Sequence, residues 1–280
     1  MKKNSLKRKA IAIKCLNTVL FGAVAVLFFL PLVWMVSSSF KPNADIFVFP
    51  IEWIPKTLKV SNYTEIWTSK DLPFGLLYLN SIKIAVITIV GKLILSASAA
   101  YAFSKMEFPL KNIIFIAFLG SMMIPAQVTV LPRFVLFEKL GLYNTHSSLI
   151  IPALFDVSAI FLLKQFFDAV PSDLSESALI DGAGHGRIWM QIVLPLSTAP
   201  LASLAVLALV NSWNDYFNPL IFVITPAKYT VSLGIRKYAA DIYTNLGLAA
   251  SVSAIAPILL LYIFCQRYFV QSIASSGIKG

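Results

Sequence analysis

Long apolar runs alternate with shorter polar segments along the chain. Six of these runs are long, at residues 16–36, 79–103, 112–131, 148–167, 198–224 and 248–269. Each approaches or exceeds the roughly 20 residues that an α-helix needs to cross the hydrocarbon core of a bilayer. The pattern therefore predicts an all-α, polytopic membrane protein with six transmembrane helices. It divides the chain into an N-terminal segment (1–15), a membrane domain (16–271) and a polar tail (272–280).

The polar segments between the runs differ in length and character. Residues 40–77 mix charged side chains with tryptophans and prolines, which predicts short helices on the outer face rather than a simple turn. Residues 133–147 have the pattern of a short amphipathic helix that ends at Gly141, and residues 225–247 form another outer segment. The remaining long interruption, residues 168–197, is expected on the cytoplasmic side.

Charge sets the expected orientation of the chain. The N-terminal segment before the first run carries several lysines and one arginine and no acidic residue. Excess Lys and Arg marks the cytoplasmic side of membrane proteins, and the first helix usually dominates. We therefore expect the N-terminus in the cytoplasm, and an even number of helices returns the C-terminus to the same side. The net charge of +10 reflects topology. No basic patch is interleaved with stacking aromatics, so nucleic acid is not an expected partner.

Composition excludes an ordinary soluble domain. Hydrophobic residues make up 58% of the chain and charged residues 13%, whereas soluble domains have about 25% charged residues. Such a chain cannot cover a water-facing surface, so we expect a multi-pass protein of the cytoplasmic membrane that contacts lipid. Cys15 and Cys265 lie at the ends of apolar runs, with no His or Cys partner nearby in sequence. Neither a disulfide nor a metal site is expected from them.

The interruption at residues 171–195 has the pattern of a helix, a sharp turn and a second helix. A proline is tolerated in a first helical turn, where Ser172 or Asp173 can cap the free N–H groups. A second apolar helical segment is predicted over residues 188–194. The break between the two helices is assigned to three glycines, Gly182, Gly184 and Gly186.

The same stretch carries a recognisable motif. The letters E-S-A at 176–178, D-G-A at 181–183 and I-V-L-P at 192–195 resemble, in order and spacing, the EAA-type motif of ABC importer permeases. Ser177 stands where that family usually has an alanine, which exchanges one small residue for another. Three other stretches resemble carbohydrate-type importer permeases: A-A-Y-A-F-S-K-M-E-F-P at 99–109, W-N-D-Y-F-N-P-L at 213–220 and Q-R-Y-F-V-Q-S-I-A-S-S-G-I-K-G at 266–280.

The resemblance implies the permease subunit of an ATP-driven, binding-protein-dependent sugar importer. Such a subunit is not an enzyme and has no cofactor of its own, because separate subunits bind and hydrolyse ATP. The implied partners are a second homologous permease, two ATP-binding cassette ATPases and an extracytoplasmic sugar-binding protein. An importer for glycerol phosphate or another small polar solute is the alternative.

The resemblance also assigns roles to residues in the polar interruption. Glu176 would pair with a cation on the ATPase, Ala178 would let the helix lie deep in a groove of that ATPase, and Gly182 would supply the turn. The full set that it assigns to ATPase coupling is Glu176, Ala178, Asp181, Gly182 and Ala183.

Two charged residues fall near the middle of predicted spans. Lys92 and Asp156 lie in the second and fourth runs, where a charge costs roughly 2.5–3.5 kcal/mol on insertion scales. Charges in such places usually face the bundle interior and are paired, so we expect an ion pair between them or with a partner subunit. The alternative is that one of the two lines the pathway of the solute.

Polar residues near the outer end of the fifth run leave two interpretations open. Asn214, Asp215 and Asn218 lie among aromatic residues, a combination that suits hydroxyl groups and sugar rings but equally suits hydrogen bonds between helices. Neither a nucleotide-binding loop of the form G-x-x-x-x-G-K-[ST] nor a catalytic constellation is recognisable. The two histidines, His146 and His185, fall on opposite sides of the membrane in the expected topology. An ion channel or a purely structural membrane subunit are the other classes considered.

Overall fold

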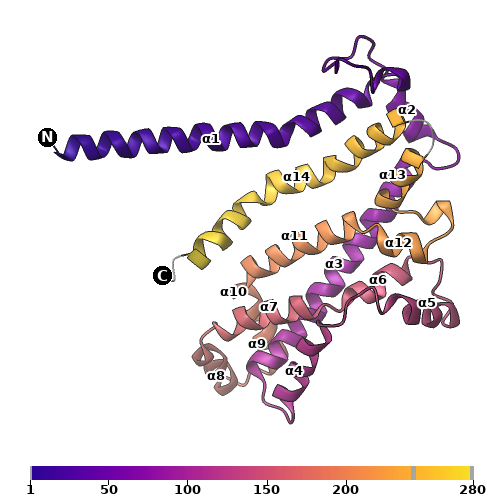
Figure 1. Ribbon diagram of the computed structural model, residues 1–280. Helices are drawn as coiled ribbons and strands as arrows, with labels where there is room; N and C mark the ends of the chain where they lie inside the picture. The colour runs from indigo at the N-terminus through magenta and orange to yellow at the C-terminus, as the bar shows by residue number, and fades with distance from the viewer. Residues whose placement is uncertain (1, 241–243, 278–280) are drawn as a thin grey trace. The chain divides into compact units, whose positions relative to one another are not determined.

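The computed structural model describes residues 2–240 and 244–277 (Figure 1). Within these residues the chain forms helices and no strand. It divides into two compact units, which we call the first unit (residues 1–69 and 235–254) and the second unit (residues 70–234 and 255–280). The last residues of the predicted tail, 278–280, lie outside the described part.

Helices are labelled in chain order. Three short non-α turns are η1 (Asn43–Asp45), η2 (Trp189–Val193, a π-helical turn) and η3 (Pro226–Lys228). The α-helices are α1 (Lys2–Ser39), α2 (Ser61–Thr68), α3 (Phe74–Lys105), α4 (Lys111–Ser121), α5 (Val130–Lys139), α6 (Ser147–Leu154), α7 (Val157–Asp168), α8 (Ser172–Ile180), α9 (His185–Ile188), α10 (Leu194–Leu196), α11 (Thr198–Asn214), α12 (Phe217–Phe222), α13 (Val231–Ala240) and α14 (Thr244–Gly277).

The first unit is tied together by buried polar groups at the end of α1. The side-chain amide of Asn62 on α2 donates to the backbone carbonyls of Ser39 at 2.8 Å and Lys41 at 3.0 Å. The Asn62 side-chain oxygen accepts a bond of 2.8 Å from the amide of Asn245 on α14. Since free carbonyls at a helix end must be paired when buried, this asparagine fixes where the segment after α1 turns. The short helices predicted within residues 40–77 are confirmed.

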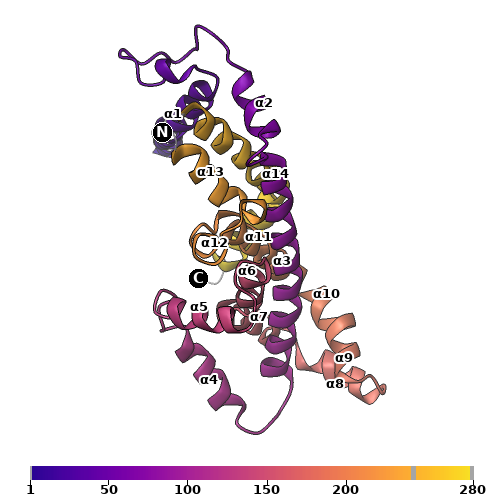
Figure 2. The same ribbon diagram turned by 90° about the vertical axis from the view of Figure 1, so that its right-hand side faces the viewer.

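The second unit is built around α3. Helices α6, α7 and α11 pack along it, and Figures 1 and 2 draw them beside it. Small residues on α3 let its neighbours approach closely, as is common between membrane helices. The buried apolar cluster at this junction consists of Ala97, Ala100, Tyr101, Ala159, Leu163, Phe167, Ile188, Val193 and Leu204.

The predicted spans are only partly continuous helices. Three described helical stretches are long and apolar enough to cross a membrane, over Ile13–Ser39, Phe74–Lys105 and Ser147–Asp168. A fourth is possible if the pair His185–Leu196 and Thr198–Asn214, bent by 81°, counts as one span. The continuous helix expected over residues 112–131 is wrong, because α4 ends at Ser121. Pro125 explains this end, since its ring clashes with the carbonyl four residues earlier and it has no N–H to donate.

Two other predicted spans are broken within their length. The run at 148–167 is interrupted at Phe155 and Asp156 between α6 and α7, and the run at 198–224 at Asp215 and Tyr216 between α11 and α12. At each break an aspartate accepts a backbone N–H of the next helix. Both runs were expected as continuous helices. Their interruption puts polar backbone inside the bundle, which membranes tolerate only where protein or water covers it.

Candidate coupling element and membrane cavity

The polar interruption folds as a helix, a turn and a second helical segment. We call residues 172–196, from α8 to α10, the coupling element. It lies near the C-terminal end of α3 (Figure 2), where the Lys105 ammonium donates to the carbonyl of Val170 at 2.6 Å. The first helix begins at Ser172 with Pro171 as its N-cap, and no side chain caps it. The expected cap by Ser172 or Asp173 is therefore wrong, because both residues already lie within the helix.

One glycine makes the turn. Gly182 has φ +84°, a left-handed conformation that glycine adopts without strain. The N–H of Gly182 bonds the carbonyl of Leu179 at 3.0 Å, and the N–H of Ala183 bonds that of Ala178 at 2.9 Å, which is the Schellman arrangement for ending a helix. Gly184 has φ −74° and Gly186 lies within α9. The break was assigned to three glycines, but only Gly182 is required for it. The second helical segment begins at His185, not at residue 188 as predicted.

One side of α8 is packed against the chain and the rest of the helix is exposed. Ser175 is buried and Ala178 packs against the apolar cluster on α3 and α7. That the small Ala178 lets the helix lie deep in a groove of an ATPase stays a prediction; within this chain Ala178 is packed against the apolar cluster. Glu176 is exposed on the opposite side. Leu179 and Ile180, three and four positions further on, are exposed beside it, Ile180 to 87%, and Leu174 is exposed elsewhere on α8.

The other residues of the motif are divided between the turn and the packing. Asp181 is the residue that follows α8 and is exposed. Ala183 is half-buried and packs against the same apolar cluster. Ser177 is exposed, and its hydroxyl donates to the carbonyl of Asp173 at 2.8 Å. The exchange of alanine for serine is therefore absorbed within the helix.

The structure brings together the two charges predicted within spans. The Lys92 ammonium on α3 lies 2.8 Å from Oδ2 of Asp156, at the start of α7. Lys92 is 8% exposed. The other carboxylate oxygen of Asp156 accepts the N–H of Ala159 at 3.2 Å. One carboxylate thus neutralises a buried cation and caps a helix, which offsets the cost of placing both in a bilayer.

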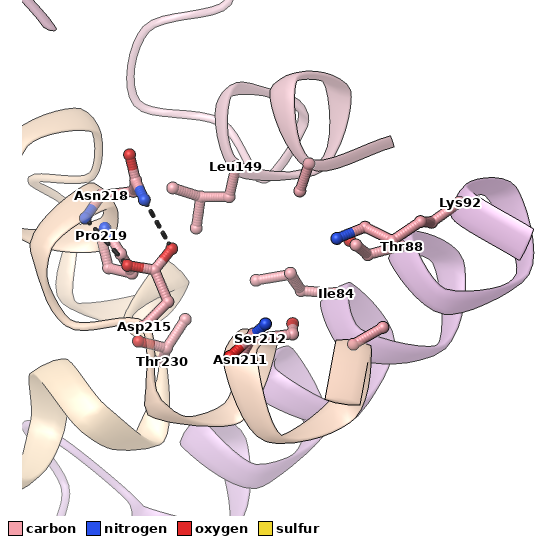
Figure 3. A pocket seen from close by; sticks show the side chains of 12 residues that line it. Ile84, Thr88, Lys92, Leu149, Asn211, Ser212, Asp215, Asn218, Pro219 and Thr230 are labelled. Atoms are coloured by element: carbon pink, nitrogen blue, oxygen red, sulfur yellow. Dashed lines mark hydrogen bonds between the residues drawn. The ribbon is translucent and has the colours of Figure 1, made fainter. Parts of the chain in front are cut away.

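A cavity of about 260 Å³ opens between α3, α6, α11 and α12 (Figure 3). Figure 3 shows Thr88 and Lys92 pointing into it from α3 and Asp215 and Asn218 from the break in the fifth run. Asn214, grouped with those two by sequence, is exposed and does not line the cavity. The cavity is lined by Ile84, Thr88, Lys92, Leu149, Ala153, Ala208, Asn211, Ser212, Asp215, Asn218, Pro219 and Thr230.

A second cavity, of about 200 Å³, continues the polar region towards the ion pair. Its lining includes Asp156 and Ser158, and it shares Lys92, Ala208 and Asn211 with the first cavity. The hydroxyl of Thr88 is buried and has no hydrogen-bond partner. A polar space of this kind at the level of two helix breaks can hold water or a hydroxyl-bearing solute. The signal that sequence reasoning missed is the presence of polar Thr88 and Asn211 within otherwise apolar runs.

Asp215 and Asn218 are held by hydrogen bonds. Asp215 accepts the Asn218 N–H at 3.1 Å and its side-chain amide at 2.8 Å. The Arg133 guanidinium on α5 donates to Oδ1 of Asn218 at 2.6 Å and lies 4.7 Å from the ring centre of Phe222. The Ser232 hydroxyl donates to the carbonyl of Asp215 at 2.5 Å. Arg133 was not among the residues expected here, although it begins the predicted amphipathic helix.

A further polar junction lies at the start of α6. The side-chain oxygen of Asn144 accepts the N–H groups of Ile224 and Thr225, each at 3.1 Å. His146 Nε2 lies 3.0 Å from the carbonyl of Lys228. Burial lowers the pKa of His146. The segment before α6 is therefore fixed to the segment after α12.

The family comparison decides the class of protein. A family model described as "Binding-protein-dependent transport system inner membrane component" matches residues 92–275. The match covers the C-terminal part of α3 from Lys92, all of α7, the coupling element and most of the residues that line the two cavities. The chain belongs to this family. It is therefore a multi-pass component of the cytoplasmic membrane and a transport component rather than an enzyme. Among the described residues no group of three or more His, Cys, Asp or Glu could hold a metal ion.

Relatives of this inner membrane component align along its whole length. It is 33% identical over 280 residues to the arabinooligosaccharides transport system permease protein AraQ of Halalkalibacterium halodurans, covering 98% of this chain and 100% of the relative. It is 31% identical over 277 residues to the sn-glycerol-3-phosphate transport system permease protein UgpE of Yersinia pestis, covering 96% and 98%.

A solved structure shows the same fold. The chain matches a bacterial ABC transporter involved in the import of the acidic polysaccharide alginate with a TM-score of 0.82 and 23% identity, over 92% of this chain and 96% of that one. A structure of the alginate transporter in complex with its alginate pentasaccharide-bound periplasmic protein matches with a TM-score of 0.54 and 13% identity, over the same shares. The all-α membrane fold predicted from the apolar pattern, and the permease fold implied by the resemblance, are thereby confirmed.

Proposed function

We propose that this chain is a permease subunit of an ATP-driven, binding-protein-dependent importer of carbohydrate. The observation that carries the proposal is the 33% identity, over 98% of the chain, to a permease named for arabinooligosaccharides. An importer for glycerol phosphate or another small polar solute is the second candidate, because the glycerol-3-phosphate permease is 31% identical over 96% of the chain.

The proposed assembly contains a second homologous permease, two ATP-binding cassette ATPases and an extracytoplasmic sugar-binding protein. The chain crosses the membrane six times in this proposal, with a membrane domain at 16–271 and both termini in the cytoplasm. The complex of the alginate transporter with a periplasmic protein supports a binding-protein partner. The bound nucleotide belongs to the ATPases.

The coupling element supplies the docking surface for an ATPase in this proposal. Glu176 lies exposed on α8 with Leu179 and Ile180 next to it, and Leu174 is exposed on the same helix. A carboxylate beside apolar side chains suits a groove that offers a cation. Gly182 fixes the angle between α8 and α9, and Asp181 and Ala183 flank it. Ala178 and Ala183 belong to the same coupling set: the small Ala178 lets α8 lie deep in the groove, and both residues also attach this surface to α3 and α7.

The solute pathway is proposed to pass the first cavity. Asp215 and Asn218 present carboxylate and amide groups there, beside Asn211 and Thr88. Hydroxyl groups of a sugar pair well with such acceptors and donors. The Lys92–Asp156 pair is assigned a structural role beside this pathway, because both charges are already satisfied by each other.

A charge reversal on α8 tests the coupling assignment. Glu176→Lys should abolish uptake and reduce the amount of ATPase that co-purifies, while leaving membrane insertion intact. Glu107→Lys is the matched control, since it reverses an exposed acidic side chain in the loop after α3. Normal uptake in Glu176→Lys shows that the assignment is wrong.

Substrate class is tested separately by uptake competition. Vesicles containing the full complex are supplied with radiolabelled arabino-oligosaccharide, and unlabelled sugars and sn-glycerol 3-phosphate are added in turn. Competition by neutral oligosaccharides supports the carbohydrate proposal. Competition by glycerol phosphate alone, or uptake of that compound only, favours the second candidate.

A further inference from the structure

The coupling element is anchored to α3 and α7 by a continuous apolar contact. On its side, Ile188 and Val193 are buried, and Ala178 and Ala183 pack beside them. The partners on α3 and α7 are Ala97, Ala100, Tyr101, Leu163 and Phe167. The inner side of the element is therefore packed into the fold, and a displacement of the element must displace what it packs against.

Polar contacts at this end join α3 to α7. The Ser104 hydroxyl donates to Oδ1 of Asp168 at 2.7 Å, and the Lys164 ammonium lies 2.7 Å from Oδ2 of the same carboxylate. The Lys105 ammonium bonds the carbonyl of Val170. None of these bonds involves a residue after Gly182. They hold α3 and α7 together, and other contacts must hold the part of the coupling element that follows Gly182.

A side-chain hydrogen bond does reach past that turn. The Tyr101 hydroxyl on α3 lies 3.2 Å from Nδ1 of His185, the first residue of α9. The two rings meet edge to face, with centroids 6.2 Å apart. Tyr101 is 5% exposed, and a buried phenol needs a partner for its hydroxyl. The tyrosine thus has an apolar ring within the cluster and a polar tip directed at the coupling element.

The helix that carries Tyr101 is uninterrupted, unlike the two broken runs that pack against it. Helix α3 runs over 32 residues, whereas its neighbours are broken at residues 155–156 and 215–216. Lys92 lies nine positions before Tyr101, which is about 14 Å along a helix, and it lines both cavities and binds Asp156. A continuous helix moves as a rod, while a broken one can bend at its break.

We propose that Tyr101 and His185 are positioning residues that transfer movement of the coupling element into α3, and through α3 to the cavity. The proposal rests on the proposed function, since it needs an ATPase that moves the element. It assigns a role to the hydrogen bond between the two side chains, beyond the packing of their rings.

The test follows the cavity during the nucleotide cycle without needing the substrate. In the full complex, Cys15 and Cys265 are replaced by Ser, and Asn211→Cys is introduced at the cavity. Labelling of this cysteine by a maleimide is measured in the nucleotide-free state and after trapping with ATP and vanadate. We expect its rate to differ several-fold between the two states, and Tyr101→Phe to abolish most of that difference. Co-purified ATPase verifies assembly.

Substitutions at the exposed His185 separate the hydrogen bond from folding. In His185→Asn the amide occupies the place of Nδ1, so the bond is retained and the labelling difference should persist. In His185→Gln the amide sits one bond further out, and in His185→Leu no polar group remains, so both should lose the difference. An Asn variant no better than the Leu variant, or a full difference in Tyr101→Phe, overturns the proposal.

Glu176→Lys in the same background keeps the two proposals apart. If Glu176→Lys retains the labelling difference, the proposed coupling to an ATPase is wrong and the transfer through Tyr101 is wrong with it. If Glu176→Lys loses the difference while Tyr101→Phe and His185→Leu keep it, coupling stands and the transfer through Tyr101 alone is overturned.

Discussion

Helices of the second unit are interrupted in two chemically different ways. In the coupling element the break is a glycine, Gly182, in an exposed turn with φ +84°. In the spans the breaks carry aspartates, Asp156 and Asp215, whose carboxylates accept N–H groups of the following helix. The exposed break needs only a backbone that bends. The breaks within the bundle need polar side chains that satisfy the backbone.

The difference follows from the surroundings of each break. At the Gly182 turn the backbone makes its own Schellman bonds and water can pair the remaining exposed groups, so the turn needs a left-handed residue but no polar side chain. Inside a membrane bundle an unpaired backbone group costs several kcal/mol, so Asp156 and Asp215 are themselves held by Lys92 and Asn218. Stability should therefore depend most on side-chain partners at the breaks in the spans. At the turn of the coupling element it should depend most on the backbone conformation of Gly182.

Removing the carboxylate of Asp156 should have the largest effect. Asp156→Leu leaves Lys92 buried without a counter-charge, which should destabilise the folded protein on the order of 3 kcal/mol. The double variant Lys92→Met, Asp156→Leu removes both charges and should recover most of that loss. Thermal unfolding in detergent, followed by size-exclusion chromatography, measures both. Equal stability of the single and double variants would contradict the structural role of the pair.

At the exposed break the sensitive property is backbone conformation. Gly182→Ala should cost about 1–2 kcal/mol, because a Cβ is unfavourable at positive φ. Gly184→Ala is the matched control, since Gly184 has φ −74° and nothing lies within 4 Å of an added Cβ. The measurement is the rate of trypsin cleavage after Arg187, which should rise in the Gly182 variant. Equal rates in the two variants would argue against a conformational requirement.

The second break in the spans should respond to the number of hydrogen bonds that are lost. Asp215→Ala removes the acceptor for the Asn218 N–H, with an expected cost of about 1 kcal/mol, as for a lost helix cap. Asp215→Asn keeps one acceptor oxygen and should lose less. The unfolding temperatures of the Ala and Asn variants in detergent measure these two losses of stability. An Asn variant as unstable as the Ala variant would mean that charge, rather than the cap, is what Asp215 supplies.

The smallest effect is expected from acid at the N-terminal end of α6. Burial lowers the pKa of His146, so the folded chain keeps the imidazole neutral while the unfolded chain protonates it near pH 6.5. The folded state is therefore destabilised relative to the unfolded state as the pH falls below about 6.5, because the unfolded chain binds a proton that the folded chain does not. His146→Gln keeps a side-chain nitrogen for the Lys228 carbonyl and cannot titrate. Its unfolding temperature should fall less than that of the wild type between about pH 7.5 and about pH 5.5.

The sequence allowed prediction of those features that depend on local chemistry. The long apolar runs predicted the spans that α1 and α3 form, and the glycine at position 182 predicted the turn of the coupling element. The juxtaposition of Lys92 and Asp156 followed from the cost of an unpaired charge in a bilayer.

The breaks could not be predicted in the same way, because they depend on distant groups. Nothing within the apolar run shows that Asp215 will cap a new helix, since the Asn218 that it binds is itself held by Arg133 on α5, 85 positions away. Likewise Gly184 and Gly186 look like breakers in sequence, but the second helix absorbs them because neither needs positive φ. The bond from Tyr101 to His185 spans 84 positions and carries no local pattern.

The bond between Lys92 and Asp156 also affects how the protein is made. Translation delivers α3 to the membrane while Asp156, 64 positions later, has not yet been synthesised. During that interval the Lys92 ammonium has no counter-charge, and α3 is poorly suited to full release into lipid. The helix is expected to stay beside the insertion machinery until α7 arrives. A chain truncated before Asp156 would keep Lys92 without its counter-charge, and such a chain should insert α3 less stably than the complete one.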